Sequence, residues 1–165
     1  MGRRRQAREA ALQALYLCEM GSMSAREAMQ SVLVYSTLDE PSAAFAHDLA
    51  VGAQAHREEL DKRIRPIAAN WSLERMTAVD RNILRLASYE LLHCPETPIG
   101  VIIDEALEIA KIYSSSDSSR FINGILDKIR LARDEASTRM QTEKPAKKPA
   151  KKRGDKAEDN QEDDA

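Results

Sequence analysis

The chain has 165 residues, with six glycines and six prolines, and its formal net charge is −2 at pH 7. This length fits one domain with a real hydrophobic core. No apolar run approaches the roughly 18 residues that a membrane span needs, and no signal-peptide pattern follows the basic N-terminus. We therefore expect a cytoplasmic protein that has no membrane partner.

The two cysteines, Cys18 and Cys94, lie in helical patterns and lack the C-x-x-C spacing of metal and redox sites. Reduced thiols that pack inside the protein fit this arrangement better than a disulfide framework or a zinc site.

Charge is distributed unevenly along the chain. Acidic residues outnumber basic ones in residues 1–136, yet the first eight residues contain Arg3, Arg4, Arg5 and Arg8. A block of positive charge on a mildly acidic body predicts a local anion site. A phosphodiester backbone is the partner that this pattern favours.

Apolar residues recur three and four positions apart almost throughout, and alternating β-branched stretches are nearly absent, which predicts an all-α protein. The first helix is expected from about residue 4 to 20, with Gly21 as its stop. Ser24 and Glu27 have the spacing of a capping box, which predicts a second helix over 25–36.

A third helix is expected to start at Pro41 and to keep its 3.6-residue period until Pro66 ends it, followed by a short segment around Trp71.

The second half of the chain shows three further helices. Thr77 caps one that reaches His93, another covers 99–113, and Asp117 caps the last, which runs to about residue 136. Residues 1–136 are therefore predicted to form a single compact bundle of six or seven helices.

Residues 137–165 differ in composition from this bundle. They are rich in Lys, Pro and Ala and then acidic, which predicts a disordered tail because such a segment cannot bury enough apolar area to order itself.

Patterns of catalytic residues are absent from the sequence. There is no Gly-rich phosphate loop, G-x-S-x-G or H-E-x-x-H motif, and the histidines His47, His56 and His93 show no ligand spacing. We expect no enzymatic activity, no catalytic residues, no cofactor and no metal site.

The first helix carries a stripe of small residues on one side, suited to close helix packing: Ala7, Ala10, Ala11, Ala14 and Cys18. Tyr16 falls on the opposite side, where two interpretations remain open. Its ring is either part of the core or partly exposed beside the arginines, available to stack on a base or to contact a partner protein.

Two later segments also leave their roles open. Asp80, Arg81 and Arg85 lie away from the predicted core side of their helix and can be simple solvent charges. Phe121 falls at the edge of the buried side of the last helix, beside Arg120, where core packing and base stacking or partner docking are equally compatible with the pattern.

Three stretches together resemble the NusB family of bacterial transcription antitermination factors. They are RRRQAREAALQALY at the start, AVDRNILRLASYEL in the middle and VIIDEALEIAKIYSSSDSSRFINGILDKI at the end. The resemblance covers nearly all of residues 3–133, and the last stretch is its most specific part.

The resemblance implies an all-helical bundle of two small subdomains without catalytic activity. It implies that the protein joins ribosomal protein NusE and that the pair binds the single-stranded boxA element of nascent ribosomal RNA. The complex would then help RNA polymerase read through terminators and support rRNA processing.

The same resemblance assigns residues to these contacts, on the condition that the arginines stand free on their helix. RNA contacts are implied for Arg3, Arg4, Arg5, Arg8, Asp117 and Phe121. Contacts with NusE are implied for Tyr16, Asp80, Arg81 and Phe121.

Two other classes of protein are alternatives to this prediction. A helical DNA-binding regulator should have a basic recognition helix, but residues 99–113 hold only Lys111 against three acids. Similar helical domains also precede the catalytic domain of some rRNA cytosine methyltransferases, in which case this chain would be a free-standing RNA-docking domain. The sequence does not decide between monomer and homodimer, and it does not reveal an RNA sequence preference.

Overall fold

The structure is a computed structural model that describes residues 2–142. Within this range there are seven α-helices, one short 3-10 helix and no strand, which confirms the predicted all-α class. None of the helices in this range combines the length and hydropathy needed to cross a bilayer. The elements are α1 (Arg3–Gly21), α2 (Ala25–Val34), α3 (Glu40–Ala55), α4 (Arg57–Ile67), η1 (Leu73–Arg75), α5 (Ala78–His93), α6 (Ile99–Tyr113) and α7 (Ser116–Thr142).

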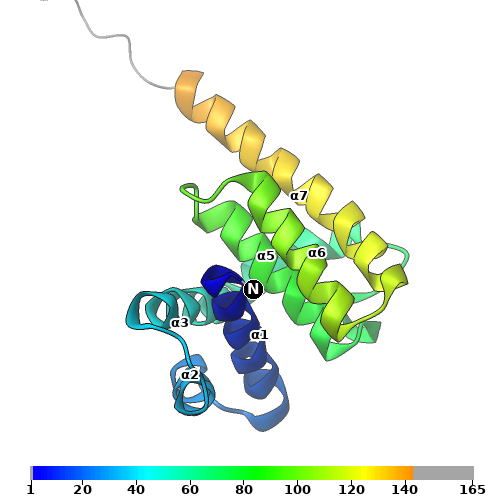
Figure 1. Cartoon of the computed structure of the whole chain (residues 1–165). Helices are drawn as coiled ribbons and strands as arrows, with labels where there is room; N and C mark the ends of the chain where they lie inside the picture. The colour runs from blue at the N-terminus through cyan, green and yellow to red at the C-terminus, as the bar shows by residue number, and fades with distance from the viewer. Residues whose placement is uncertain (1, 143–165) are drawn as a thin grey trace, which may run out of the picture.

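The helices form two groups that share one core (Figure 1). Helices α1, α2 and α3 pack on one another, and α5, α6 and α7 do the same, with α4 against α5 and α7. Because α1 and α3 also pack against α5, a continuous set of buried apolar residues joins the two groups. This arrangement confirms the predicted bundle of two small subdomains.

The small-residue stripe of α1 is buried, as predicted. Ala7, Ala11 and Ala14 are completely buried. Small side chains let helix axes approach closely, and α1 packs against both α2 and α3. The expected stop at Gly21 is wrong by one position, because Gly21 is still helical and Ser22 adopts the left-handed conformation with φ 54°.

Several predicted helix starts are confirmed. The Ser24 side chain accepts a hydrogen bond from the Glu27 N–H, and the Glu27 carboxylate accepts one from the Ser24 N–H, each at 3.2 Å. Thr77 Oγ1 accepts from the Asp80 N–H at 3.2 Å, and Pro41 lies in the first turn of α3. These caps provide partners for N–H groups that a helix start leaves unpaired.

The single helix predicted from Pro41 to Pro66 is wrong, because His56 separates α3 from α4. His56 has φ −100° and ψ 14°, and its Nδ1 lies 2.8 Å from the Gly52 carbonyl oxygen. The Gly52 carbonyl oxygen therefore faces both the His56 N–H, at 3.1 Å, and the imidazole, and the backbone leaves helical geometry at His56. Pro66 lies inside the last turn of α4, which ends at Ile67.

Helix α5 lies at the centre of the bundle, in contact with α1, α3, α4, α6 and α7. Its polar side chains are therefore buried together with its apolar ones. The buried polar residues of α5 are Asp80, Asn82, Arg85, Ser88 and Glu90. The interpretation of Asp80, Arg81 and Arg85 as solvent charges is wrong, because neighbouring helices cover α5 on nearly every side.

Helix α7 begins and ends at residues that differ from the prediction. Ser115, not Asp117, caps it, since the Ser115 side chain accepts a hydrogen bond from the Ser118 N–H at 3.1 Å. The helix continues past the predicted end at residue 136 to Thr142, and its end projects beyond the other helices (Figure 1). Residues 143–165, which make up most of the predicted tail, lie outside the described residues.

A buried ion pair joins the two groups of helices. Arg8 on α1 and Glu90 on α5 are 4% and 1% exposed. Arg8 Nη2 lies 2.5 Å from Glu90 Oε1, and Arg8 Nε lies 3.0 Å from Glu90 Oε2. This bidentate geometry is the strongest arrangement of a guanidinium and a carboxylate, and it sets the position of α1 on α5.

Removing one partner of this pair should destabilise the fold. We expect Glu90→Gln to lower the free energy of unfolding by about 3–5 kcal/mol, because the Arg8 charge then stays buried without a carboxylate. Urea denaturation followed by circular dichroism measures this change. The Arg8→Met, Glu90→Leu double variant is the control and should lie closer to the wild type, since it removes both charges. A loss below about 1 kcal/mol in Glu90→Gln would contradict the role given to the pair.

Candidate functional site

Arg3 and Arg4 are exposed at the start of α1. Arg3 Nη1 lies 2.5 Å from Asp39 Oδ2, although 78% of the Arg3 side chain is exposed. The Arg4 guanidinium lies 4.0 Å from the centroid of the Phe45 ring, a cation–π contact. Exposed contacts of both kinds are weak, so the two guanidinium groups are available to an anion.

The first turn of α1 adds to this positive potential. Gly2 precedes the helix without a capping side chain, and the first turn has no acidic residue in the described part of the chain. The unpaired N–H groups and the positive end of the helix dipole therefore lie beside Arg3 and Arg4. A helix start of this kind attracts anions.

Arg5 and Arg8 bind acidic residues of the bundle instead. Arg5 Nε and Nη2 donate hydrogen bonds to the two Glu105 carboxylate oxygens at 2.7 and 3.0 Å, and this pairing lowers the pKa of Glu105. Arg8 is buried with Glu90. The expectation that the arginine cluster stands free is therefore wrong for Arg5 and Arg8, because α6 and α5 supply acids to the covered side of α1. Arg3 also pairs with an acid, Asp39, but its side chain remains largely exposed.

Tyr16 lies in an apolar groove of about 360 Å³ on the surface of α1, α2, α5 and α6. Tyr16 is 41% exposed whereas Leu12 is 6% exposed, so the interpretation of Tyr16 as an open residue is confirmed, but its expected position beside the arginines is wrong. The groove is lined by Glu9, Leu12, Gln13, Tyr16, Leu17, Val32, Val79 and Tyr113.

The groove does not adjoin the exposed arginines. At about 1.5 Å per residue, Tyr16 lies about 18 Å from Arg4 along α1, so the two features occupy different ends of one helix. Tyr113, 44% exposed at the end of α6, was not predicted to take part in a site. An aromatic residue directly before the serine-rich link is the signal that sequence analysis overlooked.

Asp80 and Arg81 lie at the start of α5 and bind other parts of the chain. The Ser118 hydroxyl donates to Asp80 Oδ2 at 2.8 Å, which ties α7 to α5. Arg81 Nη1 donates to the carbonyl oxygens of Leu73 and Met76 at 3.0 and 2.8 Å. Both side chains are therefore engaged within the bundle, where they hold η1 and α7 against α5.

Glu19 lies near the C-terminal end of α1, where its carboxylate contacts three polar side chains of α5. Arg81 Nη2 and Asn82 Nδ2 donate to its carboxylate, the latter at 2.8 Å, and Arg85 Nη1 lies 3.6 Å away. Arg85 also binds Asp61 of α4 through two hydrogen bonds of 2.8 and 3.0 Å. Burial raises the pKa of Glu19, but the hydrogen bonds from Arg81 and Asn82 outweigh burial and lower it below the ordinary value.

Stability should therefore decrease on acidification. A carboxyl group whose folded pKa is lowered stabilises the fold above its unfolded pKa, and that stabilisation is lost as the pH falls through the folded value. We expect the free energy of unfolding to decrease as the pH drops below 4.5, the ordinary value for Glu19 and Glu105.

Urea denaturation at neutral pH and at several lower values measures this dependence. Glu19→Gln should be less stable than the wild type at neutral pH and should show a shallower decrease. Glu58→Gln, an exposed position on α4, is the matched control and should follow the wild type. Identical pH profiles for Glu19→Gln and the wild type would contradict the assignment.

Asp117 and Phe121 lie at the start of α7, where Asp117 is exposed and Phe121 is half-buried. The Phe121 ring centroid lies 5.9 Å from that of Trp71, which is 55% exposed. The structure thus forms an aromatic pair at the surface, and Trp71 is a member that the sequence analysis did not assign to any site.

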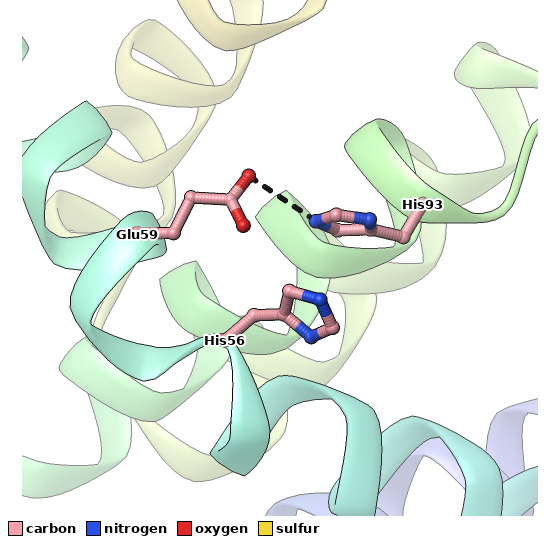
Figure 2. A group of neighbouring side chains, drawn as sticks. All are labelled: His56, Glu59 and His93. Carbon is pink, nitrogen blue, oxygen red and sulfur yellow. Dashed lines mark ion pairs between the residues drawn. The ribbon is translucent and has the colours of Figure 1, made fainter.

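The structure also brings together two of the three histidines that appeared scattered in the sequence (Figure 2). Ligand atoms of His56, Glu59 and His93 all lie within 4.8 Å of one another. The spacing of the histidines in the sequence did not indicate this proximity. His56 and Glu59 are three positions apart, but their proximity to His93 depends on how α4 meets α5, which one sequence does not show.

Comparison with known proteins identifies the family. Residues 5–130 match the model of the family described as NusB family. The transcription antitermination protein NusB of Elusimicrobium minutum is 47% identical over 135 residues, covering 81% of this chain and 96% of that protein. Its counterpart in Heliobacterium modesticaldum is 44% identical over 147 residues, covering 87% and 71%. The chain belongs to the NusB family.

Solved structures agree with this assignment. T. maritima NusB is 37% identical with a TM-score of 0.73, covering 80% of this chain and 96% of that one. A chain in the crystal structure of antitermination factors NusB and NusE in complex with dsRNA is 27% identical with a TM-score of 0.72, covering 79% and 97%.

Proposed function

We propose that this protein is a cytoplasmic, non-catalytic transcription antitermination factor. Together with ribosomal protein NusE, it binds the boxA element of nascent rRNA and supports read-through by RNA polymerase and rRNA processing. The relatives named transcription antitermination protein NusB support this function, as does the related chain in the structure with NusE and RNA. The observation that carries the proposal is the positive, uncapped start of α1.

RNA phosphates bind at this start. Arg3 and Arg4 offer guanidinium forks beside the free N–H groups of the first turn, and phosphate contacts of this kind position a nucleic acid. Arg8 acts indirectly by holding α1 on α5, and Arg5 reaches a phosphate only after releasing Glu105.

The aromatic pair of Phe121 and Trp71 provides a second RNA-binding element. Half-exposed rings stack on the splayed bases of single-stranded RNA, which is the usual source of base contacts in such complexes. Asp117 lies one turn before Phe121, where its carboxylate can accept hydrogen bonds from base amino groups.

NusE occupies the groove of Tyr16 and Tyr113. Aromatic residues in an apolar groove are typical centres of binding energy in protein interfaces. Asp80 and Arg81 support this interface from inside the bundle by holding the start of α5, on which the groove residue Val79 lies.

The exposed arginine pair should carry part of the salt dependence of RNA binding. For Arg3→Ala, Arg4→Ala, we expect the slope of log affinity against log salt to become shallower by about 1.4, at roughly 0.7 per phosphate contact on a single strand. Fluorescence anisotropy with labelled boxA RNA and NusE over a salt series measures this slope.

The matched control is Arg26→Ala, Arg75→Ala, which removes two exposed charges from α2 and η1. The double-stranded form of the same RNA should be titrated in parallel, because the related complex contains dsRNA. Equal slopes for the two arginine variants on both RNA forms would refute the proposed phosphate contacts.

Tyr16 should contribute to NusE affinity without changing the RNA affinity of the chain alone. We expect Tyr16→Ala to weaken NusE binding by about 30-fold, the effect of losing a central aromatic contact of about 2 kcal/mol. Calorimetric titration of NusE into each variant measures this change. Tyr35→Ala, at a position 90% exposed at the end of α2, is the control. An unchanged NusE affinity in Tyr16→Ala would remove the groove from the proposed interface.

A further inference from the structure

His56, Glu59 and His93 form a cluster of three metal-ligand side chains, which we call the histidine cluster. His56 joins α3 to α4, Glu59 lies in the first turn of α4, and His93 is the last residue of α5. Figure 2 shows the Glu59 carboxylate facing His93, with the His56 ring next to both of them. The cluster is separate from the RNA-binding and NusE-binding residues of the proposed function.

The spacing of the cluster fits a small divalent ion. His93 Nε2 lies 3.3 Å from Glu59 Oε1. Ligand atoms at about 2.0–2.2 Å from a tetrahedral Zn²⁺ lie about 3.3–3.6 Å from each other, so this pair is close to the separation of two ligands. The third ligand atom, from His56, lies within 4.8 Å of the others.

The hydrogen bond of His56 sets which nitrogen is available. His56 Nδ1 lies 2.8 Å from the Gly52 carbonyl oxygen, which can only accept a hydrogen bond. Nδ1 therefore carries the proton in the neutral ring, and the lone pair is on Nε2. Metal-binding histidines are commonly oriented by this type of hydrogen bond from the other ring nitrogen to a backbone carbonyl.

Packing holds the two imidazoles in place. The His93 ring stacks on Tyr89 with centroids 5.1 Å apart, and the His56 and His93 centroids are 4.2 Å apart. A Cβ at Gly52 would overlap the Cζ and hydroxyl of Tyr89, so a larger residue there would force Tyr89 to move. The ligands are thus positioned by the fold, and such preorganisation favours metal binding.

Solvent reaches the cluster from one side. A surface hollow beside it is lined by Ala55, His56, Glu58, Glu59, Lys62 and Arg63. The Glu59 and His93 side chains are 43% and 29% exposed. An ion can therefore enter without opening the bundle.

We propose that the histidine cluster binds one Zn²⁺ ion. Two imidazoles and a carboxylate are ligands that suit Zn²⁺ and poorly suit Mg²⁺ or Ca²⁺, and they leave a fourth position for water. The bound ion joins the α3–α4 junction to the end of α5. It therefore stabilises the bundle more as its free concentration rises above the dissociation constant, because the unfolded chain does not hold the three ligands together.

Calorimetric titration of ZnCl₂ into the full chain tests the proposal. We expect saturable binding of one ion per chain. Glu59→Gln and His93→Gln should each weaken binding by at least about tenfold, since even residues that only orient metal ligands have effects of that size. His47→Gln removes the third histidine, and Cys94→Ser removes the thiol next to His93. Both controls should keep the wild-type affinity.

Two further measurements separate loss of the site from loss of the fold. Circular dichroism checks that each variant is folded, and Zn²⁺ should raise the melting temperature of the wild type and the controls but not of Glu59→Gln. The absence of saturable binding by the wild type would overturn the proposal. Binding that persists unchanged in both Glu59→Gln and His93→Gln would also overturn it, because the ion would then be bound by other groups.

Discussion

The fold depends on pairing the charges that α5 carries into the interior. An unpaired charge in a protein core is unstable, so each buried ionic group of α5 needs a partner from a surrounding helix. Glu90 pairs with Arg8 of α1, and Arg85 pairs with Asp61 of α4 and with Glu19 of α1. These pairs are directional, unlike apolar contacts, and they therefore determine how α1 and α4 are placed on α5.

This constraint divides α1 into parts with different roles. Its exposed start, with Arg3 and Arg4, attracts anions, whereas Arg8 one turn later is committed to the interior. Its middle packs through small residues, and Tyr16 opens onto the groove at the far end. Because one continuous helix carries all of these features, the distance between its positively charged start and the groove is rigidly set.

Features encoded within one or two turns could be predicted from the sequence, and features that depend on which helices meet could not. The Ser24–Glu27 capping box and the alanine stripe are local, so their patterns were sufficient. The burial of Arg8 depends on Glu90, which is distant in the chain and becomes a neighbour only after folding. The break at His56 was missed because the helical spacing of apolar residues continues through this position and does not reveal the change in backbone geometry there.

Residues from both groups of helices line the groove, among them Val32 of α2 and Tyr113 of α6. Neither group alone contains it, so it exists only after α1, α2, α5 and α6 have docked. A protein that recognises this surface therefore binds the fully folded chain and not a chain in which only one group of helices has folded. If NusE binds in the groove as proposed, an incompletely assembled chain would be excluded from the complex without the action of a chaperone or protease.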